Sequence, residues 1–145
     1  MLIVFIAFVA MFNWLLSFLP NIGSQPLTLE RILGWLCRPL ALVMGVDFGD
    51  VSAVGALIGK KTILNEFVAY IDLAGLKNTI SPRSFVIATY ALCGFANFGS
   101  IAILIGGLGG LVPEKRRDFA ALGIRSMIAG SLAAFMTACV AGVII

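Results

Sequence analysis

Charged residues are absent from three long stretches of the chain, which predicts that these stretches cross a membrane as helices. The stretches run from Met1 to Leu29, from Ser84 to Pro113 and from Ser126 to Ile145. A helix that crosses the hydrocarbon core needs about 20 mainly apolar residues, because each residue advances the axis by about 1.5 Å. We therefore predict spans over residues 1–20, 82–112 and 114–144. The first ends at the breaker Pro20–Gly23 and lacks the basic leader of a secretory signal.

Residues 27–45 combine polar and apolar positions at the spacing of an amphipathic helix. One face carries Glu30, Arg31, Gly34 and Arg38, and the opposite face carries Leu29, Ile32, Leu33, Leu36 and Leu40. Thr28 is a suitable N-cap, and the carboxylate of Glu30 suits the positive end of the helix dipole. The pattern predicts a helix that lies in the membrane interface and that Pro39 kinks or ends.

Two apolar arms within residues 47–75 are each too short to cross a membrane alone. They are Val51–Ile58 and Ile63–Leu73, and the polar sequence Gly59-Lys60-Lys61-Thr62 lies between them. Each arm has about half of the residues that a span needs. We predict a re-entrant hairpin that turns at this polar sequence, with Thr62 as the N-cap of the second arm. The alternative is an ordinary hairpin outside the membrane, which the apolar content of both arms disfavours.

The middle of residues 82–112 predicts a break in the helix. Ser81 is a suitable N-cap and is followed by proline at the first helical position. Gly94 and Gly99 then flank the polar amide of Asn97. This composition favours an unwound segment, and broken membrane helices indicate transporter binding sites. Asn97 either belongs to such a site or hydrogen-bonds a neighbouring helix as a packing contact.

Several small residues are interpreted as packing residues. Gly106 and Gly110 have the spacing with which membrane helices pack closely against one another. Cys37, Cys93 and Cys139 are isolated and odd in number, so they form neither a disulfide framework nor a metal site. We interpret all three thiols as small apolar side chains that fill the interior.

The overall composition narrows the class of protein. Apolar residues make up 61% of the chain and charged residues 12%, against typical values of about 45–50% and about 25%. A globule of 145 residues cannot hide so much apolar surface, which excludes a soluble enzyme, a disordered tail and a nucleic-acid-binding protein. The basic loop Glu114–Asp118 predicts a cytoplasmic loop and a C-terminus outside the cell. The expected fold is one all-α, multi-pass integral membrane unit.

Glu66 is the acidic residue that lies inside a predicted membrane arm, away from the segment ends. A carboxylate at membrane depth costs at least a few kcal/mol unless a partner or a ligand satisfies it, so it is a candidate for function. When ionised it accepts hydrogen bonds, and ribose hydroxyls are suitable donors. A structural ion pair with Lys60 or Lys61 is the alternative. An intramembrane enzyme is disfavoured, because the chain has no histidine and no second acid near Glu66.

Two long motifs in the same order resemble the C-terminal part of the concentrative nucleoside transporters. The first is Asn65-Glu66-Phe67-Val68-Ala69-Tyr70. The second is Tyr90-Ala91-Leu92-Cys93-Gly94-Phe95-Ala96-Asn97-Phe98-Gly99-Ser100-Ile101. The likeness covers essentially the whole chain. It implies a nucleoside importer of the cell (inner) membrane, coupled to sodium or to protons, which assembles as a homotrimer and moves a transport domain against a scaffold like an elevator.

The resemblance also implies roles for individual residues in substrate binding. Glu66, with Asn65 beside it, would bind the ribose hydroxyls. Asn97 and Ser100 would complete the ribose contacts, and Phe95 would pack near the base. The expected partners are therefore a nucleoside and the membrane lipid, and no resident metal or other cofactor is expected.

The resemblance leaves part of the family's site unaccounted for. Residues 1–20 would match a scaffold helix, and residues 47–75 would match the second re-entrant hairpin. The first hairpin, which supplies base-reading side chains, and the helix that completes the sodium site have no counterpart in these residues. We therefore expect a C-terminal fragment that supplies the ribose-binding half of the site, with base preference and coupling ion left open. The alternative is a non-transporting small membrane protein that assembles with other membrane chains through its glycine-rich helices.

Overall fold

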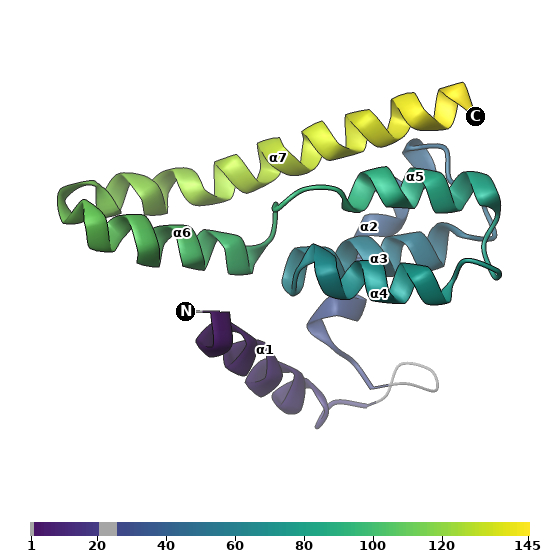
Figure 1. The fold of residues 1–145 in the computed structure, drawn as a ribbon. Helices are drawn as coiled ribbons and strands as arrows, with labels where there is room; N and C mark the ends of the chain where they lie inside the picture. The colour runs from purple at the N-terminus through teal and green to yellow at the C-terminus, as the bar shows by residue number, and fades with distance from the viewer. Residues whose placement is uncertain (1, 21–25) are drawn as a thin grey trace.

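The computed structural model describes residues 2–20 and 26–145, and the regular elements of these residues are all helical (Figure 1). They are α1 (Leu2–Leu16), α2 (Leu29–Val43), α3 (Val51–Ile63), α4 (Glu66–Gly75), α5 (Pro82–Leu92), α6 (Phe98–Leu111), the 3₁₀ turn η1 (Pro113–Lys115) and α7 (Arg116–Ile144). The predicted all-α fold is confirmed. Most of the predicted breaker Pro20–Gly23 lies outside the described residues.

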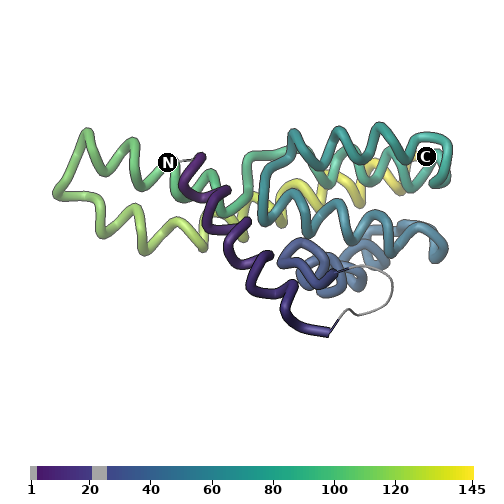
Figure 2. The backbone as a smooth tube through the Cα atoms, turned by 90° about the horizontal axis from the view of Figure 1, so that it is seen from below, coloured from purple at the N-terminus to yellow at the C-terminus, as the bar shows by residue number. Residues whose placement is uncertain are grey.

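The hydrophobic core is formed by α2 to α5 together with the C-terminal half of α7 (Figure 1). Its largest fully buried apolar side chains include Ile58, Leu73, Ile87 and Leu92. The helix α6 and the first half of α7 extend away from this core as an antiparallel pair (Figures 1 and 2). The helix α1 contacts α2 and α6. The amide of Asn13 in α1 is hydrogen-bonded to the first turn of α2.

Glycines bring the backbones of α2 and α3 into direct contact. A Cβ atom at Gly59 would lie 2.4 Å from the backbone nitrogen of Gly34, and a Cβ atom at Gly55 would lie 2.9 Å from the Gly34 carbonyl oxygen. Gly55 and Gly59 therefore form a small-xxx-small pair that packs on Gly34, the arrangement with which membrane helices approach most closely. Because Gly59 is used for packing, it does not contribute to a turn.

The predicted position of the hairpin turn is wrong. The helix α3 continues through the polar sequence to Ile63, and the chain reverses at Leu64 and Asn65. Asn65 is the N-cap of α4, because its Oδ1 accepts a hydrogen bond from the Val68 N–H at 3.0 Å. Thr62 instead donates its hydroxyl to a carbonyl of its own helix at 2.8 Å. Asparagine is also the stronger N-cap of the two. The re-entrant placement of this hairpin stays a prediction.

The base of the hairpin is joined to the start of α5 by polar contacts. The Ser81 N–H donates to Asp50 Oδ2 at 3.0 Å, and the Asp47 N–H donates to Ser84 Oγ at 3.2 Å. Ser81 Oγ also accepts from the Ser84 N–H at 3.1 Å, so Ser81 is the N-cap of α5. These contacts join the start of the hairpin to the start of α5, a few residues after the hairpin ends.

The helix α2 differs from its prediction in two ways. It passes through Pro39 without ending and continues to Val43. Pro39 is exposed, so its ring takes up no space in the packed interior. The buried face carries the small residues Gly34, Cys37 and Ala41, while much of the leucine stripe is exposed. Small residues are buried because α3 approaches too closely for larger ones. Thr28 is the N-cap as predicted, and the interfacial placement stays a prediction.

The helix α7 packs along both halves of the broken stretch, α5 and α6 (Figure 1). A Cβ atom at Gly142 would meet Ile87 of α5 at 2.9 Å, and one at Gly123 would meet Ile101 of α6 at 2.7 Å. Gly110, by contrast, is exposed and has no neighbouring atom within 4 Å of a Cβ position in the described chain. The predicted packing role of Gly110 is therefore not fulfilled within this chain, because α7 contacts the other side of α6.

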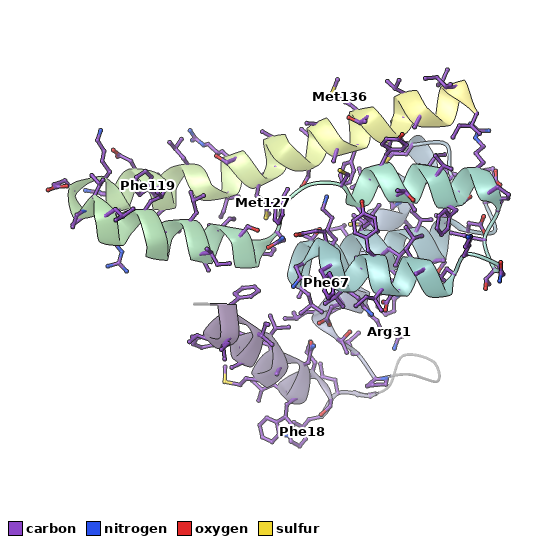
Figure 3. All side chains as sticks on the ribbon, in the orientation of Figure 1. Phe18, Arg31, Phe67, Phe119, Met127 and Met136 are labelled. Atoms are coloured by element: carbon purple, nitrogen blue, oxygen red, sulfur yellow. The ribbon has the colours of Figure 1, made fainter. Side chains whose placement is uncertain are left out.

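Apolar side chains cover much of the outer surface. Examples include Trp14 of α1, Phe18 just after α1, and Met136 and Val143 of α7. Met136 points away from the other helices (Figure 3). Pro113–Ile144 is the described segment that is long and apolar enough to cross a membrane, while α1 and α6 are apolar but shorter. Such a surface needs lipid or other membrane helices around it.

The predicted packing role of the cysteines holds for one residue and fails for another. Cys37 is buried in the core between α2 and α3, whereas Cys93 is exposed. Cys93 directly follows α5, so the end of that helix removes it from the packed interior.

Candidate binding site at the helix break

The break between α5 and α6 covers residues 93–97 and places two helix ends inside the molecule. Gly94 has φ +138°, a backbone conformation that residues with a Cβ atom rarely adopt. Asn97 is 2% exposed and is the N-cap of α6, because its Oδ1 accepts a hydrogen bond from the Ser100 N–H at 2.7 Å. The positive end of the α6 dipole therefore faces the break.

The hairpin turn supplies a carboxylate to this break. Asn97 Nδ2 donates a hydrogen bond to Glu66 Oε2 at 3.0 Å, although the two residues are 31 positions apart. The other oxygen of Glu66, Oε1, receives no hydrogen bond from the described residues. Glu66 also lies in the first turn of α4, where the helix dipole favours a negative charge. One carboxylate oxygen is thus held by the protein, while the other is open to a donor.

The side chains of Asn97 and Glu66 are hydrogen-bonded to each other. Asn97 does hydrogen-bond a neighbouring helix, but its partner there is the carboxylate of Glu66. The predicted ion pair of Glu66 with a lysine is absent from the described residues. Lys60 pairs with Asp72 instead, and Lys61 donates to a backbone carbonyl of α5 at 3.0 Å.

Three of the predicted site residues, Phe95, Asn97 and Ser100, line an open groove between the start of α6 and the middle of α7. Its volume is about 310 Å³. The α7 side of the groove includes Met127, which points toward the break (Figure 3). Phe95 is 80% exposed, so its ring is accessible, and the hydroxyl of Ser100 makes no hydrogen bond in the described part of the chain. The groove thus offers the ring of Phe95 and the available hydroxyl of Ser100 beside the amide of Asn97, which is hydrogen-bonded to Glu66.

A larger open groove of about 900 Å³ lies between α1 and the hairpin. It contains none of the predicted site residues. Its acidic side chains have partners within the chain, because Asp72 pairs with Lys60 and Glu30 accepts hydrogen bonds from Asn13. The break offers acceptor and donor groups that the described residues leave open, so it is the stronger candidate for ligand binding.

Two features of the site differ from what sequence reasoning expected. Asn65 lies beside Glu66, but its side-chain oxygen is occupied as the cap of α4. The local composition predicts a turn at Lys61, yet its side chain is buried in the interior with 1% exposure. The spacing of Lys61 from Val54 and Ile58 would have placed it on the buried face of one continuous helix.

Residues 1–142 match a family model described as the C-terminus of Na⁺ dependent nucleoside transporters. The chain belongs to the concentrative nucleoside transporter family. This match confirms the resemblance carried by the two motifs. The family is one of transporters and not of enzymes, and membership implies an integral membrane protein.

Individual relatives match over nearly the whole chain. Solute carrier family 28 member 3 from Eptatretus stoutii is 45% identical over 99% of this chain, which covers 23% of that protein. The structure of a CNTnw variant in its intermediate 2 state has a TM-score of 0.88 at 45% identity and covers 99% of this chain and 37% of its own. CNTnw in an inward-facing substrate-bound state has a TM-score of 0.79 at 44% identity, with 97% and 34% covered. The chain thus spans 23% to 37% of the length of these proteins.

Proposed function

We propose that this chain supplies the ribose-binding half of the substrate site of an ion-coupled nucleoside importer. The observation that carries the proposal is the half-satisfied carboxylate of Glu66, which Asn97 orients from the helix break. A ribose presents two neighbouring hydroxyls, each of which can donate a hydrogen bond. Hydrogen bonds to an ionised carboxylate are roughly twice as strong as those between neutral groups, so Glu66 is suited to a neutral sugar with several donors.

The groove residues fit the rest of a nucleoside. Ser100 carries a hydroxyl that can both donate to and accept from a sugar oxygen. Phe95 offers an exposed ring, and aromatic rings stack on nucleobases of any sequence. Base preference then depends on side chains from the family's other hairpin, so this half of the site reads the sugar and only the face of the base.

The coupling ion and the assembly are further parts of the proposal. The family description names sodium, which supports sodium over protons as the coupling ion. The helix that completes the family's sodium site has no counterpart in these residues, so we place the coupling-ion site mostly in other segments of the carrier. We also propose that the full-length carrier assembles as a homotrimer.

Alternating access of the elevator type is supported by the comparison of two states of one relative. This chain matches a CNTnw variant in its intermediate 2 state with a TM-score of 0.88 and CNTnw in an inward-facing state with a TM-score of 0.79. This difference supports a rearrangement within the residues that the chain covers. Because α1 contacts the rest of the chain mainly through α2 and α6, we propose that α1 belongs to a scaffold and that the hairpin and the broken helix move against it.

The proposed location is the cell (inner) membrane, with several passes and with the C-terminus outside. The loop around η1 supports this orientation, because Lys115, Arg116 and Arg117 are all exposed there. Short loops rich in lysine and arginine stay on the cytoplasmic side of a membrane.

Uptake measurements with a chimeric carrier test the proposal. In this chimera, residues 1–145 replace the matching C-terminal region of CNTnw, and the parent CNTnw is the positive control. We expect the chimera to take up uridine. We expect Glu66→Gln to reduce this uptake to less than about a tenth, and a tenfold change corresponds to about 1.4 kcal/mol. The matched control is Asp72→Asn on the same helix, which removes a charge whose partner is Lys60 and should leave most uptake intact.

The outcomes separate the two candidate functions. Unchanged uptake in the Glu66→Gln chimera would contradict the role of Glu66, and no uptake by an unmutated chimera that reaches the membrane would contradict the transport function itself. In the second case, the alternative of a non-transporting membrane protein is favoured if the chain forms a defined complex whose stability does not respond to nucleosides.

A further inference from the structure

Lys61 is a charged side chain that the proposed function does not yet use. It lies near the end of α3, is 1% exposed, and donates from Nζ to the carbonyl oxygen of Ala91 at 3.0 Å. Its ammonium group also lies 5.8 Å from the ring centre of Phe135 in α7. A buried ammonium group is costly, so a lysine at this depth needs a reason for its position.

The acceptor of Lys61 is a carbonyl that the helix break has freed. The last four carbonyls of an α-helix lack partners within the helix, and those of α5 end inside the protein. Lys61 satisfies Ala91, and the hydroxyl of Tyr70 in α4 donates to the Thr89 carbonyl at 2.8 Å. The two arms of the hairpin therefore each supply a donor to the C-terminal end of α5.

The hairpin tip places opposite charges at the two sides of the break. Lys61 provides a positive charge at the C-terminal, negative end of the α5 dipole. Glu66 provides a negative charge next to Asn97, at the N-terminal, positive end of the α6 dipole. Both charges thus match the helix end that they face.

The geometry points to Lys61 as a positioning residue for the sugar half of the substrate site. It does not need to touch the nucleoside. By binding the end of α5, it sets the start of the break, and the break in turn sets where Asn97 meets Glu66. This inference rests on the proposed function of the Glu66–Asn97 pair and adds a residue that acts through it.

Substitution of Lys61 in the chimeric carrier tests this role. For Lys61→Met, we expect the KM for uridine to rise by about tenfold, which corresponds to about 1.4 kcal/mol, at a Vmax per carrier molecule in the membrane that stays close to the unmutated value. We also expect a smaller ratio between the uptake of uridine and that of 3′-deoxyuridine, because a displaced Glu66–Asn97 pair binds the ribose hydroxyl less well. A lysine with only a structural role would lower the amount of carrier and leave both KM and this ratio unchanged.

Lys60→Met is the matched control. It removes the same charge from the neighbouring position, where the partner is Asp72, and should leave the KM and the sugar discrimination unchanged. If Lys61→Met does not reach the membrane, Lys61→Gln, which keeps a shorter donor, is measured in the same way with the same expected changes. Failure of both variants to reach the membrane would assign Lys61 a purely structural role and overturn the inference.

The unmutated chimera and Glu66→Gln are measured in the same preparation, so that the two proposals can fail separately. Absence of uridine uptake by the unmutated chimera would contradict the proposed function. Normal uptake that depends on Glu66, together with an unchanged KM and unchanged sugar discrimination in Lys61→Met, would contradict only the positioning role of Lys61.

Discussion

The contact between α2 and α3 predicts that Gly59→Ala destabilises the carrier. A Cβ atom at Gly59 would lie 2.4 Å from the Gly34 nitrogen and 2.7 Å from both the Gly34 Cα and the Glu30 carbonyl oxygen. All three atoms belong to the backbone of α2, so no side chain can rotate away. Ordinary contact begins at 3.4 Å, and the two helices must therefore separate by about 1 Å at this point.

The size of this effect can be bounded and measured. Forcing one extra methyl group into a packed contact typically costs about 1–3 kcal/mol, and the backbone neighbours place Gly59→Ala in the upper part of that range. The assay is thermal unfolding of the purified chimeric carrier in detergent. The matched control is Gly75→Ala, because a Cβ atom at Gly75 meets nothing within 4 Å. Equal melting temperatures for Gly59→Ala, Gly75→Ala and the unmutated carrier would refute the claim of backbone contact.

Three further predictions concern the site and the hairpin base. Asn97→Asp replaces the amide donor to Glu66 with a second carboxylate, so uridine uptake should fall by at least about tenfold in the chimera. The control is Thr137→Ala, which removes an exposed hydroxyl that does not line the groove. The Ser81 N–H and the Ser84 hydroxyl hold the pKa of Asp50 below its ordinary value of 3.8. The stabilisation by this carboxylate is therefore complete above pH 3.8, and it is lost as the pH falls through the lower pKa of the folded state. Melting temperatures below pH 4 should therefore drop less in Asp50→Asn than in the unmutated carrier, and parallel curves would contradict this. A maleimide should label Cys93 faster than the buried Cys37, and mass spectrometry that finds the reverse order would contradict the exposure of the break.

The helical content and the break could be predicted from local patterns. Charge-free stretches locate apolar helices, and the break follows from glycines that flank an amide, both of which depend only on residues close in sequence. Ser81 and Thr28 were identified as N-caps for the same reason, because a cap bonds to a backbone group two or three residues away.

The hairpin turn could not be placed from local composition. Gly59, Lys60 and Lys61 have the composition of a turn when they are considered alone. Their roles depend on partners far away in sequence, because Gly59 packs on α2, Lys60 pairs with Asp72 and Lys61 reaches the end of α5. Tertiary contacts therefore override the local preference, and the chain turns at Asn65 instead.

The contact between Glu66 and Asn97 also lay outside the reach of sequence patterns. Both residues were singled out, but the hydrogen bond that joins them connects two motifs 31 residues apart. Nothing in the periodicity of either motif indicates that the hairpin tip reaches the break. Only the packing of α3 and α4 against α5 brings the two groups within 3.0 Å.

The partners of the hairpin tip have a consequence for biosynthesis. Lys61 and Glu66 are translated 30 and 31 residues before their partners Ala91 and Asn97. At roughly 5–20 residues per second, each charge leaves the ribosome about 2–6 s before its partner does. An unpaired charge is expensive in hydrocarbon, so in the proposed membrane arrangement the hairpin waits at the surface or in the translocation machinery during this interval. In that arrangement the hairpin takes its final depth only after α5 and the break have emerged. The hairpin would thus insert after α5, although it precedes α5 in the sequence.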